Sequence, residues 1–162
     1  MNKLSLITAI LSSFIGFNAN AYQTEVNGSY EHTEIEEGKI NTVTVSGQYY
    51  FNPVETGNAP LAEAAFLNQA SNVSVAYSFA ELSGDEVATV KNNSFGAKGE
   101  AYLPTPYLPV YTSASYSHTQ TKTDGKKDNG DRFALEIGTI LTPNFLVAVG
   151  YTNIADQVAL DA

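Results

Sequence analysis

Residues 42–51 read TVTVSGQYYF, a stretch in which the character of the side chains alternates. Val43, Val45, Tyr49 and Phe51 occupy one set of alternate positions, and mainly small or polar residues occupy the other. A period of two places successive side chains on opposite faces of a β-strand. The stretch therefore predicts a strand with one apolar face and one largely polar face.

The same alternation recurs in six further segments of the chain. They are residues 24–31, 72–79, 94–103, 110–118, 132–137 and 145–152. The segments run near the ~9–11 residues that a tilted membrane-crossing strand needs, which exceeds the ~5–6 typical of soluble sheets. Their second face carries mostly Ser, Thr, Ala and Gly, whereas the wet face of a soluble sandwich would carry many more Lys and Glu. We therefore predict an all-β fold, an antiparallel transmembrane β-barrel meander with about seven strands in this chain.

The first 21 residues have the features of a cleavable signal peptide. A lysine stands near the start, an apolar stretch follows over residues 4–17, and residues 19–21 (ANA) form a small-x-small cleavage site. The apolar stretch is shorter than the ~20 residues that a membrane-spanning helix needs. We therefore expect cleavage between Ala21 and Tyr22.

Composition narrows the classes of partner and site. The chain has 17 acidic residues against 8 basic ones, and it has no cysteine. We expect no nucleic acid partner, because binding to phosphates depends on basic patches. The lack of cysteine excludes disulfides, thiolate metal sites and lipid attachment at a leader cysteine. Residues 22–162 suit one domain, which we predict to be the barrel.

The connections between the predicted strands are of two kinds. One set is acidic and contains glycine or lysine: residues 34–39, 81–93 and 119–131. The other set alternates with it and contains proline: residues 52–71, 103–109 and 142–144. If Tyr22 starts on the periplasmic side, the acidic set faces outward and the second set faces the periplasm. Short periplasmic turns are typical of outer-membrane barrels.

Aromatic residues near the ends of the predicted strands indicate two girdles at the membrane interfaces. The expected periplasmic rim comprises Tyr22, Tyr49, Phe51, Tyr102, Tyr107, Tyr111 and Phe145. The expected outer rim comprises Tyr30, Tyr77, Phe79, Phe95, Tyr116, Phe133 and Tyr151. Aromatic residues favour strands in general, so the girdles support the barrel without being specific to it.

The second connection departs from the short-turn pattern. Residues 58–69 read NAPLAEAAFLNQ, in which Asn58 can cap a helix and Pro60 stands early. We predict a short periplasmic helix of one or two turns. We expect Glu63 to be an exposed helix residue, in preference to part of an inward-folded plug or a contact with periplasmic partners.

The stretch around this helix resembles a known family. Residues 49–71, YYFNPVETGNAPLAEAAFLNQAS, are similar to the bacterial putative porins, in which a Pro-Leu-Ala-Glu-Ala-type segment follows an early strand. The resemblance implies a Gram-negative outer-membrane barrel with a passive-channel role.

Six charged residues fall on the small-residue face and are the candidate lumen-lining charges. They are Glu25, Glu31, Lys98, Glu100, Arg132 and Glu136. A cation exposed to lipid at the bilayer midplane costs about 2–4 kcal/mol, so we expect these residues to point inward. There they would pair across strands or bias ion passage.

No pattern in the chain indicates catalysis. There is no nucleophile elbow and no phosphate-binding glycine loop, so we expect no enzyme and no cofactor. Asp124, Asp128 and Asp131 lack the register and terminal Glu of an EF-hand. We predict a solvated charged loop there and no metal site.

These features predict a porin-like barrel of the bacterial outer membrane that allows passive diffusion of small solutes or ions. Expected partners are outer-membrane lipid, the barrel-assembly machinery and small solutes. Two alternatives stay open: a non-conducting structural or adhesive outer-membrane barrel, and a soluble secreted β-sandwich that binds a ligand. Seven crossings are an odd number, whereas single-chain bacterial barrels close with an even count. We therefore expect the N-terminal part of a longer barrel, or a barrel that lacks its closing strand.

Overall fold

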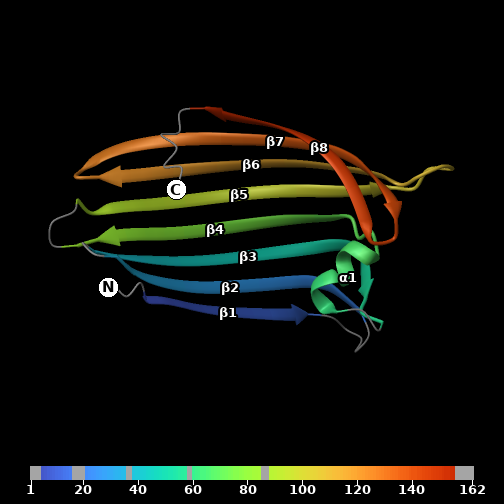
Figure 1. The fold of residues 1–162 in the computed structure, drawn as a ribbon, viewed down its shortest axis with the longest axis horizontal. Coiled ribbons are helices and arrows are strands. Elements are labelled where there is room, and N and C mark those ends of the chain that lie inside the picture. The colour runs from blue at the N-terminus through green and yellow to red at the C-terminus, as the bar shows by residue number, and fades with distance from the viewer. Residues whose placement is uncertain (1–4, 16–20, 36–37, 58–59, 85–87, 156–162) are drawn as a thin grey trace.

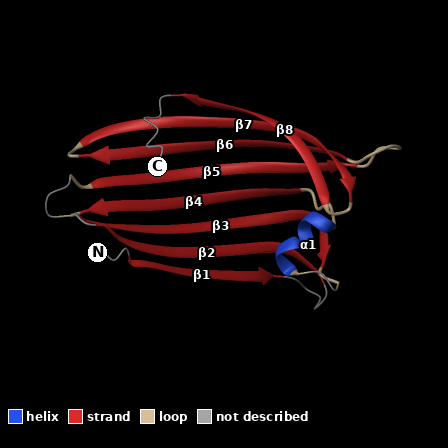
Figure 2. Cartoon of the chain, in the orientation of Figure 1, coloured by secondary structure: helices blue, strands red, loops and turns tan. Residues whose placement is uncertain are grey.

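The computed structural model describes residues 5–15, 21–35, 38–57, 60–84 and 88–155, and it consists of one antiparallel sheet with a short helix (Figure 1). The strands are β1 (Ser5–Ile15), β2 (Ala21–Ile35), β3 (Gly38–Glu55), β4 (Asn72–Ser83), β5 (Val90–Leu103), β6 (Val110–Thr123), β7 (Lys126–Thr142) and β8 (Phe145–Ala155). Each strand pairs with the next in the sequence, which is a meander. Figure 2 shows the helix α1 (Leu61–Leu67) at one end of the sheet.

The seven predicted strand segments correspond to β2 through β8, which confirms the strand prediction. An eighth strand, β1, lies within the predicted signal peptide and pairs antiparallel with β2. Cleavage between Ala21 and Tyr22 stays a prediction. In the described part of the chain, β1 and β8 each pair on one side only, so the sheet has two edges and is not closed.

The pairing register separates the side chains of the sheet into two faces, because residues directly opposite in antiparallel strands point to the same side. One register row contains Glu25, Gln48, Ser74, Lys98, Ser115, Ala134 and Thr152. A neighbouring row contains Thr24, Tyr49, Val73, Gly99, Ala114, Leu135 and Tyr151. We call the side of the first row the polar face and the side of the second row the apolar face.

The apolar face is broadly exposed. Its exposed members include Val43, Val45, Val73, Val75, Tyr77, Phe95, Tyr116, Phe133, Leu135, Ile137, Val147 and Val149. Ile137 is 59% exposed and Val149 is 70% exposed. A soluble protein rarely leaves so large a continuous apolar surface open to water, whereas a membrane barrel presents such a band to lipid.

The connection over residues 119–131 differs from the prediction of an extended acidic loop. Strands β6 and β7 continue through it, with Thr123 directly opposite Lys126. The turn between them consists of Asp124 and Gly125, both with positive φ (48° and 81°). An Asp-Gly pair in this conformation forms a two-residue hairpin turn whose twist matches that of the flanking strands. In the sequence, the Asp-Gly dipeptide is therefore a hairpin-turn signal, and it indicates that β6 and β7 both extend up to this turn.

The predicted periplasmic girdle is wrong for three of its members. Tyr22 and Tyr111 are almost fully buried, each 4% exposed, and they lie on the polar face. Tyr102 faces the same side, and its ring centroid lies 5.2 Å from that of Tyr111. Tyr49 and Phe51 do lie exposed on the apolar face, as predicted.

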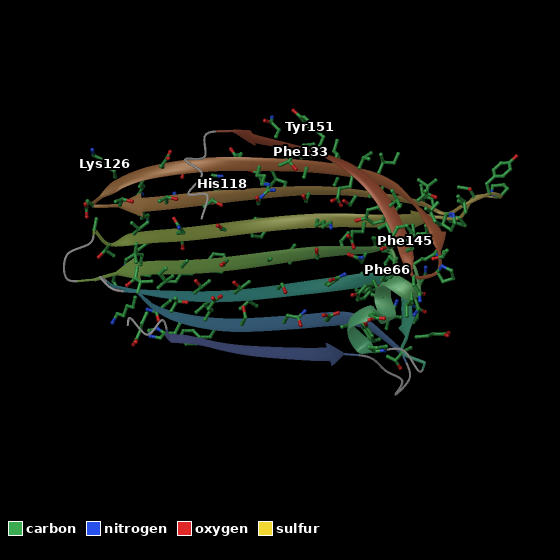
Figure 3. The ribbon with its side chains drawn as sticks, in the orientation of Figure 1. Phe66, His118, Lys126, Phe133, Phe145 and Tyr151 are labelled. Carbon is green, nitrogen blue, oxygen red and sulfur yellow. The ribbon has the colours of Figure 1, made fainter. Side chains whose placement is uncertain are left out.

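The predicted outer girdle lies further from the strand ends than expected. Phe133, labelled in Figure 3, stands midway along β7, and Tyr116 stands midway along β6. The reason is that the strands are longer than a bilayer requires, so they extend past these aromatic rings.

The short helix predicted in the second connection is present as α1. Pro60, rather than Asn58, occupies its N-cap position, and Asn58 lies outside the described residues. Ala64 is fully buried against Tyr22, Tyr50 and Val54, so α1 covers part of the polar face. Within the described residues, no helix is long and apolar enough to cross a bilayer.

Glu63 is exposed on α1, which agrees with its prediction as a solvated helix residue.

The two ends of the sheet differ in the elements that lie there. The helix end carries α1 and the residue 142–145 turn, and the opposite end, the hairpin end, carries the Asp124–Gly125 turn (Figure 1).

Gly138 provides a test of the β7–β8 packing. A Cβ atom placed on Gly138 would lie 2.4 Å from the Val147 backbone oxygen and 2.7 Å from the Ala148 Cβ. Gly138→Ala should therefore push β8 away from β7 and lower the free energy of unfolding by about 1–3 kcal/mol. Urea denaturation in detergent micelles measures this. Gly99→Ala is the control, because a Cβ there meets nothing within 4 Å. Equal midpoints for the two variants would contradict the β7–β8 register.

Candidate functional site

All six charged residues predicted for the lumen fall on the polar face, since each belongs to a register row of that side. The structure brings three of them together: Lys98 and Glu100 on β5, and Glu136 on β7. Glu25 lies in a separate group near α1. Glu31 and Arg132 have no ion pair in the described part of the chain. We call Lys98, Glu100, Glu136 and their hydrogen-bond partners the charge network.

The framework of the charge network is one register row. It runs from Asn72 on β4 through Glu100 on β5 and Ser113 on β6 to Glu136 on β7. Asn72 donates from Nδ2 to Glu100 Oε2 at 3.0 Å, and Ser113 donates from Oγ to Glu136 Oε2 at 2.7 Å. Asn72 and Ser113 are 3% and 4% exposed, so both donors are held by packing.

Tyr111 links the two carboxylates from the next row on β6. Its hydroxyl lies 2.9 Å from Glu100 Oε1 and 3.2 Å from Glu136 Oε2. One hydroxyl proton serves both acceptors, so Tyr111 holds the two carboxylates at a fixed separation across β6. Hydrogen bonds to ionised acceptors are roughly twice as strong as those between neutral groups.

Lys98 supplies the positive charge of the network. Its Nζ lies 2.7 Å from Glu100 Oε1 and 3.9 Å from Glu136 Oε2. The Lys98 side chain is 40% exposed, so these ion pairs add little to stability. Their effect is on geometry, because the network orders three charges on neighbouring strands of one face.

A second polar group surrounds Glu25 beside α1. Glu25 accepts hydrogen bonds from Asn27 Nδ2 at 2.8 Å and from the Tyr50 hydroxyl at 3.2 Å. The Tyr50 ring packs edge-on against Tyr22, with centroids 5.6 Å apart. The helix α1 therefore covers the rings of Tyr22 and Tyr50, and the Glu25 carboxylate lies next to them.

Arg132 and Lys98 border an open hollow of about 280 Å³ on the polar face. Its other lining residues are Ser74, Ala76, Gly96, Ser115 and Ser117 of the polar face, together with Ala97 and Tyr116 from the neighbouring apolar-face positions. Most of these are small, so the two cations stand at the edge of a space that water and solutes can occupy.

The acidic residues of the β6–β7 hairpin do not form a common site. Asp128 belongs to the polar face and Asp131 to the apolar face, while Asp124 is in the turn. Among the described residues, no group of three or more His, Asp or Glu side chains is arranged to hold a metal ion.

Reasoning from the sequence missed Asn72, Tyr111 and Ser113 as members of the charge network. The signal was available for Tyr111, because the alternation along β6 gives it the same face as Ser113 and Ser115. The partnership itself requires the register, which joins residues 25 positions apart in the sequence.

Removal of the Tyr111 hydroxyl tests the network. Tyr111→Phe leaves Glu100 and Glu136 without their shared donor, and we expect the free energy of unfolding to fall by about 1 kcal/mol. Tyr107→Phe is the control, since Tyr107 is 93% exposed in the β5–β6 connection. Thermal denaturation followed by circular dichroism in micelles measures both. An identical loss in the two variants would mean that the Tyr111 hydroxyl bridges nothing.

Comparison with known proteins gives two findings. A family model described as putative general bacterial porin matches residues 1–161. The crystal structure of the Acinetobacter baumannii outer membrane protein Omp33 is similar, with 50% sequence identity and a TM-score of 0.61. The match covers 84% of this chain and 53% of that chain, so this chain spans about half the length of Omp33. No curated protein sequence matches significantly. The likeness confirms the predicted fold class, an antiparallel outer-membrane β-barrel, present in this chain as an unclosed sheet.

Proposed function

Because this chain belongs to the putative general bacterial porin family, we propose that its sheet forms the wall of an outer-membrane channel for passive diffusion of small solutes or ions. The chain performs no chemistry in this role. Solutes pass along the polar face, and lipid covers the apolar face.

The observation that carries this proposal is the division of the sheet into two faces. The exposed residues of the apolar face extend across β2 to β8. The six candidate charges, the charge network and the hollow at Arg132 all belong to the opposite face. A channel wall needs this division, because lipid and water lie on its two sides.

The charges of the polar face support a mild preference for cations. Four of the six candidate residues are glutamates and two are cations, and Lys98 is held by two of the glutamates. Rings and clusters of charge at a pore wall bias ion passage through their local potential. Four negative and two positive charges leave the six residues with a net charge of -2, which attracts cations.

The helix α1 supports a narrowing at one mouth. It lies over Tyr22, Tyr50 and Val54 on the polar face at the helix end. Because α1 lies on the lumen side of the proposed channel wall, it narrows the path for solutes. We expect the size limit for solutes to be set near the helix end.

A non-conducting barrel is the second candidate, since small barrels fill their lumen with side chains. The small residues that line the hollow between Lys98 and Arg132 favour an open path instead. Planar-bilayer recordings of the full-length protein purified from outer membranes separate the two. We expect discrete openings, and a protein that inserts without any opening would exclude the channel.

Charge selectivity tests the assignment of the polar face to the lumen. Glu136→Gln should lower the cation-to-anion permeability ratio, and Lys98→Gln should raise it, because each changes the charge beside the path. Reversal potentials in a salt gradient measure the ratio. Lys39→Gln is the control, since Lys39 lies on the apolar side of β3 at the hairpin end. Shifts of the same size in the control would contradict the assignment.

A further inference from the structure

Three lysines stand side by side at the hairpin end, on the apolar side of the sheet. Lys91 on β5 is directly opposite Lys122 on β6, and Lys122 is directly opposite Lys127 on β7. Neighbouring strands lie only ~4.8 Å apart, and like charges in directly opposite positions destabilise a sheet. The chain has just 8 basic residues and a net charge of -9, so this lysine row is a local exception.

The lysine row is only partly neutralised by the protein. Lys91 Nζ lies 2.9 Å from Glu81 Oε2. Lys122 and Lys127 have no ion pair in the part of the chain that the structure describes. Two positive charges on adjacent strands are thus available to an external anion.

Polar, hydrogen-bonded residues lie between the exposed apolar residues of the apolar face (the apolar band) and the lysine row. Tyr116 marks the end of the band on β6, and its hydroxyl donates to Asp131 Oδ1 at 2.7 Å. His118 Nδ1 lies 2.8 Å from the same oxygen. One row further along, Gln120 donates to Asn129 at 3.2 Å. The surface therefore passes from apolar, through hydrogen-bonded polar groups, to cationic along one hairpin.

The β2–β3 hairpin repeats this boundary. Residues 29–33 read SYEHT, and residues 115–119 read SYSHT. The Tyr30 hydroxyl donates to Asn41 Oδ1 at 3.0 Å, and His32 Nδ1 lies 2.7 Å from that oxygen. Tyrosines in this position are typical of the interface between acyl chains and headgroups. The repeat indicates that the membrane boundary passes through both hairpins at the Tyr-x-His segments.

The lysine row lies well above this boundary. Lys122 is six residues beyond Tyr116, which is about 20 Å along an extended strand. With the ~45° tilt of a membrane strand, the height is about 14 Å, whereas a phospholipid headgroup layer adds only about 5–7 Å to each side of the core. A lysine can reach back toward the membrane, but a taller headgroup meets the row directly.

We propose that Lys122 and Lys127, together with Lys91, bind the phosphate groups of a lipid with a bulky anionic headgroup in the outer leaflet. Lipopolysaccharide has this chemistry. The bound phosphate replaces the missing counter-charges of the row and relieves the repulsion between its lysines. This role depends on the membrane location of the sheet and not on conduction, so a failure of the channel proposal would leave it unaffected.

The test compares two lysines that are adjacent in sequence but on opposite faces. Lys126, labelled at the hairpin tip in Figure 3, is opposite Thr123 on the polar side, whereas Lys127 belongs to the lysine row. Binding of fluorescent lipopolysaccharide to the full-length protein in a neutral detergent is titrated for each variant. Lys127→Gln should weaken binding about fivefold and Lys122→Gln/Lys127→Gln about 30-fold, as ~1 kcal/mol for each lysine predicts. Lys126→Gln should stay within about twofold.

Three further arms identify the ligand. Dephosphorylated lipopolysaccharide should bind the unaltered protein at least as weakly as the double variant binds the intact lipid, because the double variant keeps Lys91. Inorganic phosphate should not compete at millimolar concentration, and phosphatidylglycerol in mixed micelles should compete poorly. Equal losses for Lys126→Gln and Lys127→Gln would show only a general charge effect and overturn the proposal. Full competition by inorganic phosphate, or by phosphatidylglycerol, would overturn the assignment of a tall phosphorylated headgroup.

Discussion

Backbone hydrogen bonding is the constraint on which this structure depends. In the hydrocarbon core of a bilayer no water is present to pair with an exposed N–H or C=O group, so every strand must pair with a neighbour. The ladders from β2 to β7, which include one register shift between Tyr22 and Thr24, satisfy this requirement over most of the sheet. The two edges of the sheet do not, and in a membrane each edge strand needs another strand to pair with.

The two faces follow from the ladders. Once the register is set, alternate side chains point to opposite sides of the sheet. The position of a charged residue along its strand therefore decides which face carries the charge. Lys98, Glu100 and Glu136 all fall on one side, and there the same ladders bring them within ion-pair distance. At the hairpin end, the charged residues of the apolar side begin at the Tyr-x-His segments, where Asp131 lies directly opposite His118. The charge network and the lysine row are thus separated only by which of two alternating faces each residue occupies.

Much of the fold was predictable from the sequence, because alternation is a local property. It identified β2 to β8, and the Pro-Leu-Ala-Glu-Ala stretch identified α1. The length of the β6–β7 hairpin was missed because charged residues such as Lys126 and Asp128 look like loop, although the Asp124–Gly125 turn keeps them paired. The six candidate charges share one face of the sheet, as the alternation predicts, but the role of Tyr111 depends on a contact between distant strands. Such contacts follow from register, which no single segment encodes.

The most direct test of a membrane wall is the environment of consecutive residues on one strand. The chain has no cysteine, so single cysteines at positions 134, 135, 136 and 137 of β7 can be labelled without a background. In reconstituted vesicles we expect a lipid-chain quencher to reach labels at Leu135→Cys and Ile137→Cys, and a water-soluble quencher to reach those at Ala134→Cys and Glu136→Cys. Quenching by the water-soluble reagent at all four positions would contradict a membrane wall.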